Sequence, residues 1–369
     1  MRIIFFVHSL RKGGAERLLL QVSNHLLKKN HDIRILQAID FDEYPEYTTS
    51  KKEFLLKPQE YKWPYALPKL IRQYRKYVRA QNPDLICIFS PLMVIVAALS
   101  LMRLKTVHVI QGYGLVSKQK SFKNIIYKAL DKISFRILNY NAIVPTNSLK
   151  ESILGYLSIK SDNVKIVTSG VDSKSLKFNS NIDLENKIII TMLGTVYKEK
   201  GQRLAIEAVK QLKKINNNLD FVVKIIGEGS DEKYIKKRIK QNDLKENIVL
   251  LGRRDDAFEL ISSSHIFWHL SQSEGLPLVI MEAMALGVPV IGFDVRGVND
   301  VIRNNQNGYL VKYKDMSAIA SYTNSLINDE ECYSRFINAA RNEIDEIYNI
   351  EKMCINYEEY FLQLCNVKI

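Results

Sequence analysis

The sequence is poor in cysteine and histidine, and it lacks both a long apolar run and a complete nucleotide-binding glycine motif. Its four cysteines form no CxxC pair and no cluster with histidine, so we expect reduced thiols and no metal site. The longest run without a charged residue, 85–102, is divided by Ser90-Pro91 into a strand and a capped helix, which argues against a membrane span. No signal-peptide pattern is present, so we expect a cytoplasmic protein.

Phosphate-binding motifs of other enzyme classes are also missing. No P-loop occurs, and residues 227–229 begin a dinucleotide fingerprint that Glu232 does not complete, so neither ATP nor NAD is expected. Residues 40–42 have the DxD spacing of a metal-binding motif, but their acidic loop favours a solvated segment. We therefore expect no cofactor.

Positive charge is in excess, and it lies in one half of the chain. Residues 1–180 contain 29 Lys and Arg against 13 Asp and Glu, whereas residues 181–369 contain 24 against 27. This asymmetry predicts an acidic partner for the first half alone, either an anionic membrane surface or a phosphate-rich ligand. Basic residues in two segments form the expected membrane or acceptor side: Lys69, Arg72, Arg75, Lys76, Arg79, Lys118, Lys120 and Lys123.

The first of these segments, 65–81, is a predicted helix in which Tyr74 and Tyr77 alternate with the basic residues. One interpretation is a membrane-surface helix, with its tyrosines at the level of the lipid headgroups. The other is a solvated amphipathic helix that packs Leu70 and Val78 against the core.

Strands and helices alternate in both halves of the chain, which predicts an α/β fold with two Rossmann-like, doubly wound parallel sheets. We expect one domain in 1–172, a polar linker in 173–186, a second domain in 187–349, and a C-terminal helix in 350–369 that can cross back to the first domain. Segment 40–63 is expected to be irregular and 298–303 helical. Because ligands of such sheets bind beyond the carboxyl ends of the strands, the two domains should face each other across an active-site cleft.

Residues 274–289 have the strongest chemical pattern in the sequence. Glu274 lies on a loop after an expected strand, Pro277 suits the first turn of a helix, and Gly287 suits its end. Glu282 follows on the same helix, and the amides at the helix start favour an anion. Carboxylates accept hydrogen bonds from sugar hydroxyls, and amides bind a diphosphate, so the pattern suits a phosphorylated sugar. The alternative is that both glutamates are solvated residues of an ordinary helix.

Further motifs extend this pattern. Gly13-Gly14 joins an expected strand to a helix, residues 194–201 do the same in the second half, and Lys200 lies where an ammonium can pair with a phosphate. With the sequence from Ser273 to Val290, the chain resembles glycosyltransferase family 4, the group of retaining, nucleotide-sugar-dependent enzymes with the GT-B fold. The resemblance spans nearly the whole chain and is densest in 265–311.

The resemblance implies roles for the matching residues. Glu274 would bind the donor sugar, Glu282 the ribose, and Lys200 the diphosphate, while the loop at 253–254 would contact the base. The implied catalytic residues are Glu274, Lys200 and Gln111. The implied donor-binding residues are Gly13, Gly14, Gly194, Thr195, Lys200, Arg253, Arg254, Glu274, Gly275, Leu276, Pro277, Leu278 and Glu282.

The chain departs from the family at two positions. Thr195 stands where the family usually has an arginine that binds phosphate. Arg253, Arg254 or Arg296 could supply the missing positive charge. Gln111 stands where the family often has histidine, and His108 on the preceding strand is interpreted as a core residue that finds its hydrogen bonds there. We therefore expect front-face displacement with retention, in which the departing phosphate takes the acceptor's proton.

The resulting hypothesis is a metal-independent, retaining hexosyltransferase. It would move a hexose or N-acetylhexosamine from a nucleoside-diphosphate sugar, with UDP preferred, to a lipid-linked glycan in bacterial capsule or O-antigen synthesis. It would act peripherally on the inner face of the cell membrane. A sugar-nucleotide epimerase on a similar fold is an alternative enzyme, and a basic nucleic-acid binder is an alternative of another class. No nucleic-acid-binding module is recognisable, so no nucleic-acid partner is expected.

Overall fold

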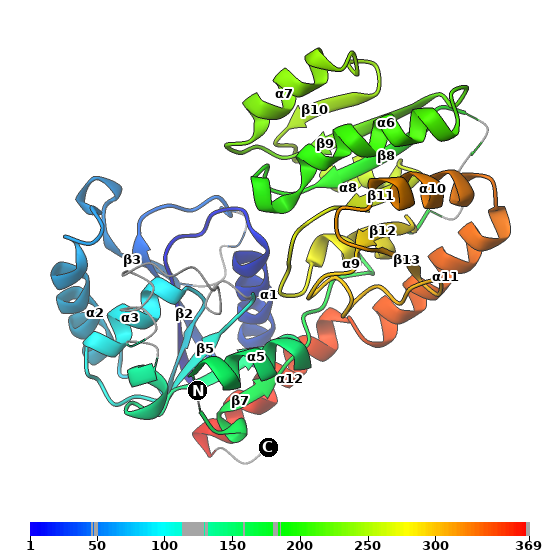
Figure 1. Ribbon diagram of the computed structural model, residues 1–369. Helices are drawn as coiled ribbons and strands as arrows, with labels where there is room; N and C mark the ends of the chain where they lie inside the picture. The colour runs from blue at the N-terminus through cyan, green and yellow to red at the C-terminus, as the bar shows by residue number, and fades with distance from the viewer. Residues whose placement is uncertain are drawn as a thin grey trace. The chain divides into compact units, whose positions relative to one another are not determined.

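The computed structural model describes residues 1–45, 47, 51–112, 129, 132–157, 159–179, 184 and 186–366. The chain divides into two compact units (Figure 1), Met1–Thr168 with Glu351–Ile369, and Ser169–Ile350. Each unit contains one sheet whose paired strands are all parallel. The predicted α/β class with two parallel sheets is confirmed.

The first unit has seven described strands in the order β3-β2-β1-β4-β5-β6-β7. Its strands are β1 (Arg2–Val7), β2 (Asp32–Ile39), β3 (Lys51–Leu56), β4 (Leu85–Ile88), β5 (Thr106–Val109), β6 (Asn141–Val144) and β7 (Val164–Ile166). Its helices are α1 (Gly14–Lys28), η1 (Pro58–Glu60), α2 (Leu67–Gln81), α3 (Pro91–Leu99), α5 (Asn147–Leu157), η3 (Ser161–Asn163) and the C-terminal α12 (Ile350–Cys365).

Successive side chains of β1 enter cores on opposite faces of this sheet, as the two-residue period of a strand requires. Ile4 and Phe6 are fully buried in a core with residues of α2, α3 and α5. Phe5 points to the other face, where its ring lies 6.4 Å from that of Phe361 on α12. The strand is therefore covered on both sides, which explains its continuous apolar sequence.

The second unit has six described strands in the order β10-β9-β8-β11-β12-β13. Its strands are β8 (Ile188–Leu193), β9 (Phe221–Ile226), β10 (Ile248–Gly252), β11 (Ile266–His269), β12 (Val290–Phe293) and β13 (Gly308–Val311). Its helices are η4 (Lys198–Lys200), η5 (Gln202–Leu204), α6 (Ala205–Ile215), α7 (Glu232–Gln241), α8 (Ala257–Ser262), α9 (Leu278–Ala285), α10 (Met316–Ile327) and α11 (Glu330–Glu346). One core includes α6, α7 and α10, and another is centred on α9.

Three local predictions are wrong. Residues 51–56, expected to be irregular, form β3, an edge strand whose charged and half-exposed side chains hide the strand pattern. The helix expected at 298–303 is a series of turns. Strand β13 was not expected, because it has only four residues, begins at Gly308 of the expected Asn307-Gly308 turn, and shows no recognisable period.

The predicted linker does not begin as a free segment. Ser173 is buried and donates to Asp345 of α11, and the amide of Asn179 donates to Leu286 O at 3.0 Å. Ser169 to Asn179 therefore belong to the second unit. Val171 also pairs with Asn349, so the two segments that lead to and from the first unit run together here.

The C-terminal helix α12, red in Figure 1, is part of the first unit. Tyr357 and Phe361 are fully buried, and Glu358 lies between His25 Nε2 at 3.0 Å and His31 Nε2 at 3.1 Å. Within the described residues, no helix combines the length and the apolar character needed to cross a bilayer.

Candidate active site

The topology of the second sheet brings two functional loops together. The strand order reverses between β8 and β11, which are hydrogen-bonded neighbours although strands β9 and β10 lie between them in the chain. At such a switch point the loops after both strands diverge and leave a crevice at the carboxyl edge. The loop after β8 leads to Lys200, and the loop after β11 leads to Glu274.

Lys200 and Glu274 form a short ion pair at this edge. The Lys200 Nζ atom lies 2.8 Å from Oε1 and 2.9 Å from Oε2 of Glu274. His269, the last residue of β11, places its Nε2 atom 3.2 Å from Oε1. The Glu274 and His269 side chains are only 12% and 7% exposed, whereas Lys200 is 37% exposed and has room to move.

The surroundings of Glu274 keep it ionised. Burial acts to raise the pKa of its carboxyl, but the hydrogen bond and charge of His269, together with those of Lys200, outweigh burial and lower the pKa to about 2. Both oxygens of Glu274 are therefore acceptors at neutral pH, which suits them to bind hydroxyl groups.

Two turns hold these loops against each other. Gly201 has φ +77°, and a Cβ atom there would lie 1.7 Å from Leu270 O, so only glycine lets the Lys200 turn approach the end of β11. Gly297 has φ +83° and faces the Glu274 carbonyl in the same way. The Glu274 amide donates to Arg296 O at 3.0 Å, and the Gln272 amide donates to Glu199 O at 2.9 Å.

Helix α9 begins directly after this loop. Pro277 is its N-cap residue, so the helix begins at Leu278, one residue later than expected. The amides of Gly275, Leu276 and Leu278 have no hydrogen-bond acceptor within the described part of the chain. At the other end Gly287 has φ +83° and, with Val288, forms the C-terminal bonds of a Schellman motif. The free amides therefore follow Glu274 in the chain and lie at the positive end of the helix.

Glu282 lies on α9 and is 3% exposed. This burial excludes the alternative of two solvated glutamates, because neither Glu274 nor Glu282 extends into bulk water. Carboxylates this buried are rare unless they are paired.

The loop after β8 carries Gly194 and the exposed Thr195. Gln202, which is 3% exposed, donates from its amide to Thr195 O at 3.1 Å and so fixes the turn. Two of the three arginines considered as replacements for the family arginine contact acidic neighbours. Arg253 lies 3.8 Å from Glu228, and Arg254 forms two hydrogen bonds with Asp256 at 2.8 and 2.6 Å.

In the first unit, the glycine loop precedes α1. The Tyr44 hydroxyl lies 3.1 Å from both the amide and the carbonyl of Gly13, so this turn is held from the β2–β3 connection. Gly14 is the first residue of α1. Gln111 follows β5 and is half-buried. It belongs to a different unit from Glu274 and Lys200.

His108 on β5 is fully buried, as the core interpretation requires. Burial lowers the pKa of its imidazole to about 3, so the ring is neutral at physiological pH. Neither ring nitrogen has a hydrogen-bond partner among the described residues, so the expectation that this histidine is satisfied within the core is not met there. In the acidic DxD loop, Asp42 forms an ion pair with Lys52, in which Oδ2 lies 2.7 Å from Nζ.

The basic helix α2 differs in part from the membrane-surface interpretation. Tyr74 is buried and stacks on Phe6, and the Tyr77 hydroxyl donates to Glu53 at 2.9 Å, so neither ring is available at a headgroup level. Lys69 pairs with Glu60 at 2.6 Å. Lys118, Lys120 and Lys123 lie outside the described residues.

His269 is the site residue that sequence reasoning missed. The available signal was a histidine at the end of an expected strand, five residues before Glu274, in a chain with only six histidines. Gln202 was missed as well, because a glutamine in a turn has no distinguishing pattern.

Two family models together match residues 12–343 of the chain. The model described as Glycosyltransferase Family 4 matches residues 12–175, and the model described as Glycosyl transferases group 1 matches residues 172–343. The chain belongs to this glycosyltransferase family. Glycosyl transfer is therefore its general activity.

Relatives and solved structures agree with this assignment. An uncharacterized glycosyltransferase of Haemophilus influenzae is 27% identical over 95% of this chain and 97% of its own length. A UDP-Gal:alpha-D-GlcNAc-diphosphoundecaprenol alpha-1,3-galactosyltransferase of Escherichia coli is 28% identical over 70% of this chain and 69% of its own. The structure of Anabaena HepE in complex with UDP and glucose matches with a TM-score of 0.84 at 17% identity, covering 98% of this chain and all of that one. The GT-B fold is thereby confirmed.

Proposed function

We propose that this glycosyltransferase transfers a hexose or N-acetylhexosamine from a UDP-sugar to a lipid-linked glycan in bacterial surface-polysaccharide synthesis. The observation that carries the donor side is the buried, ionised Glu274 beside the partly exposed Lys200 at the switch point of the second sheet. Similarity to a galactosyltransferase that uses UDP-Gal and a diphosphoundecaprenol acceptor supports both substrate classes. These features also favour transfer over the epimerase and the nucleic-acid binder.

The geometry suits the binding of a sugar diphosphate by this chain alone. Glu274 accepts hydrogen bonds from sugar hydroxyls, the amides at the start of α9 bind phosphate oxygens, and Lys200 neutralises the diphosphate. These fixed positive groups stabilise the charge that develops on the leaving diphosphate, which is the task a metal ion performs in other enzymes. We therefore propose transfer without a metal or other cofactor.

The proposed reaction retains the anomeric configuration. The acceptor hydroxyl attacks the anomeric carbon from the leaving-group side, the bond from that carbon to the phosphate oxygen breaks, and the departing diphosphate takes the hydroxyl proton. No protein base is needed. Gln111 then binds a sugar hydroxyl without exchanging a proton.

A panel of nucleotide sugars tests the donor. Thermal unfolding is measured with each nucleotide sugar, and the accepted donor raises the midpoint because it binds only the folded state. The anomeric configuration of the product, read by NMR, tests retention. Consumption of the nucleotide sugar without an acceptor would support the epimerase instead, and a panel without any stabilising nucleotide would contradict the proposal.

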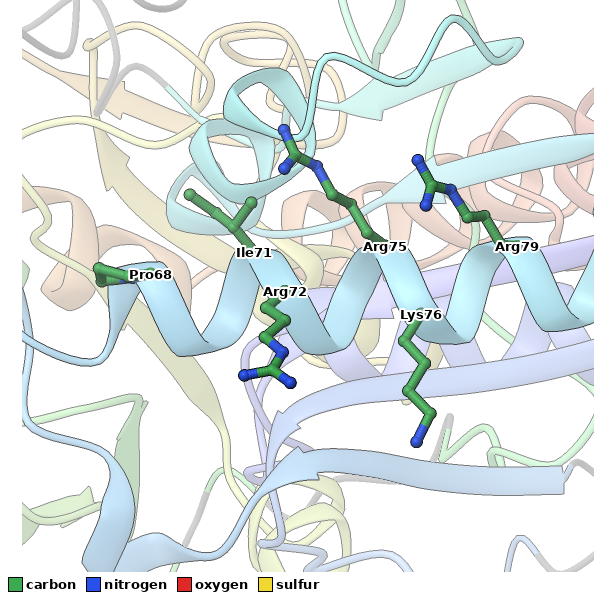
Figure 2. Close-up of a pocket in the computed structure, with 6 residues that line it drawn as sticks. All are labelled: Pro68, Ile71, Arg72, Arg75, Lys76 and Arg79. Carbon is green, nitrogen blue, oxygen red and sulfur yellow. The ribbon is translucent and has the colours of Figure 1, made fainter.

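For the acceptor side we propose contact with an anionic membrane surface through α2. Arg72, Lys76 and Arg79 are exposed and form no ion pair within the described residues. With Pro68 and Ile71 they line a shallow groove (Figure 2), and Arg75 adds a guanidinium that is anchored to Ser100 O at 2.8 Å. The basic chains leave the helix on two sides, Arg75 and Arg79 on one and Arg72 with Lys76 on the other (Figure 2).

Vesicle sedimentation tests this surface. The triple variant Arg72→Ala, Lys76→Ala, Arg79→Ala should lose most binding to vesicles that contain anionic phospholipid. The matched control removes Lys233, Lys237 and Lys240, which are exposed at the same spacing on α7 of the second unit. Equal loss in both variants, or equal binding of the wild type to neutral and anionic vesicles, would contradict a role for α2.

A further inference from the structure

His269 holds the same carboxylate as Lys200, from a different element and with a different freedom to move. Its ring ends the buried strand β11 and stacks at 6.5 Å on Phe267 of the same strand. Lys200 reaches Glu274 through a flexible four-carbon chain from the turn after β8. One donor is therefore fixed by the sheet, and the other can leave.

The two partners together leave the carboxylate little room for a third. An ionised carboxylate has about four acceptor positions on its two oxygens. His269 and Lys200 both approach Oε1, and Lys200 also approaches Oε2. These contacts leave one position, on Oε2, and Lys200 stands beside it, so the carboxylate can accept from two sugar hydroxyls only when Lys200 withdraws. The same ammonium is the group that would neutralise the diphosphate.

We propose that His269 is a positioning residue, which keeps Glu274 in place while the Lys200 ammonium transfers from this carboxylate to the donor diphosphate. The inference rests on the proposed function, because it requires a nucleoside-diphosphate sugar as the arriving ligand. No covalent bond changes in this step. When Lys200 leaves, Oε1 keeps its bond to His269 and both acceptor positions of Oε2 become available to sugar hydroxyls.

The cost of losing His269 follows from burial. Glu274 is 12% exposed, and among the described residues His269 from β11 and Lys200 from the turn after β8 are the charged or titratable groups that act on its carboxyl. Without His269, the departure of Lys200 would leave a buried carboxylate with no charged partner, which is strongly unfavourable. Lys200 would then stay on Glu274, or Glu274 would take a proton.

Two substitutions separate the hydrogen bond from the packing of the ring. His269→Phe keeps a planar ring and removes the donor, whereas His269→Gln supplies an amide donor at similar reach. Because His269 acts through Glu274, we expect His269→Phe to lower kcat roughly ten- to hundredfold, less than deletion of a donor at the reacting group does, and to weaken UDP binding roughly tenfold. We expect His269→Gln to recover most of both.

The pH profile shows whether the effect passes through Glu274. His269→Phe should lose activity as the pH falls from about 7 to about 5, because a Glu274 with one partner is protonated at higher pH. His269→Gln should not show this additional acidic loss. A role in packing alone predicts that the phenylalanine variant is the more active of the two, with no new acidic limb, and that result would overturn the inference.

A measurement on the unsubstituted protein guards against misfolded variants. In NMR spectra, the imidazole ¹⁵N resonances of His269 should show a hydrogen-bonded Nε2–H both before and after UDP is added. The side-chain resonance of Lys200 should shift when UDP is added. Loss of the imidazole hydrogen bond on UDP binding would contradict the inference. If the wild type bound no nucleoside diphosphate at all, the proposed function would fail and the inference with it. Normal wild-type binding with an unaffected His269→Phe variant would refute the inference alone.

Discussion

At the scale of single residues, the donor site depends on charges that are held in place before any ligand arrives. Lys200, Glu274 and His269 come from the ends of two neighbouring strands, and the two distances between Lys200 and Glu274, 2.8 and 2.9 Å, are those of charge-assisted hydrogen bonds. A site of this kind needs little reorganisation when charge develops on a leaving group. Its consequences are testable in two variants.

Removal of the Lys200 ammonium should affect turnover more than folding. We expect Lys200→Ala to lower kcat roughly 10²- to 10³-fold, the range found when a preorganised stabilising group is deleted. Lys198 lies in the same turn, is exposed and forms no ion pair within the described residues, so Lys198→Ala is the matched control. Steady-state kinetics with the accepted donor checks both. Similar losses in the two variants would point to the turn and not to the ammonium.

The low pKa of Glu274 predicts a specific pH dependence of stability. Its folded pKa of about 2 lies below the unfolded value of 4.5, so its contribution is full above about pH 4.5 and is lost as the pH falls towards 2. Wild-type stability should therefore fall by on the order of 3 kcal/mol more than that of Glu274→Gln over this window. Denaturant unfolding at several pH values measures the difference. Exposed Glu246→Gln should leave the wild-type pH dependence unchanged.

At the scale of elements, turns decide whether the functional loops can meet. Gly201 and Gly252 both have positive φ, +77° and +68°, but a Cβ atom at Gly252 would meet nothing within 4 Å. Gly252→Ala should therefore cost only about 1 kcal/mol of backbone strain. Gly201→Ala adds a clash with Leu270 O and should cost more than about 3 kcal/mol.

Thermal and denaturant unfolding compare the two glycine variants. Because Lys200 directly precedes Gly201, we also expect Gly201→Ala to reduce activity in the surviving folded protein, whereas Gly252→Ala leaves it nearly unchanged. Equal destabilisation by the two substitutions would show that backbone conformation, and not the approach to β11, sets the need for glycine.

Elements with a strong period were predictable from the sequence, and short or exposed ones were not. The strand and the helix expected on either side of Gly13-Gly14 are present as buried β1 and amphipathic α1. Strand β3 was missed because an edge strand needs no apolar face, and α2 was predicted without knowing that Tyr74 enters the core. Residue propensities and periodicity predict local secondary structure. Whether a tyrosine packs into the core depends on residues that are distant in the sequence.

At the scale of the whole molecule, charge is divided between the halves of the sequence. Residues 1–180 carry a net charge of +16 and the remainder −3. Exposed charges attract an anionic surface over about 8–10 Å at physiological salt, and added salt screens them. Electrostatic binding to a membrane is therefore weakened by salt, whereas binding through an apolar surface is not.

Association with anionic vesicles should therefore fall steeply with salt. We expect most of the binding at about 0.05 M NaCl to be lost by about 0.5 M, where the screening length is only a few ångströms. Donor binding at the buried Glu274 site should change much less over the same range. Vesicle sedimentation and UDP titration across a salt series measure the two. Salt-resistant vesicle binding would contradict the electrostatic origin.

The fold class, the family and the loop that carries Glu274 were predictable from local patterns in the sequence, namely buried strands, glycine turns and the Glu274–Glu282 spacing. The tertiary structure then set which groups meet. It brought Lys200 to Glu274 across 74 positions of sequence, added His269 to the pair, and removed Tyr74 from the surface. The order of strands in the sheet creates these contacts, and that order is a property of long-range pairing that no local period records.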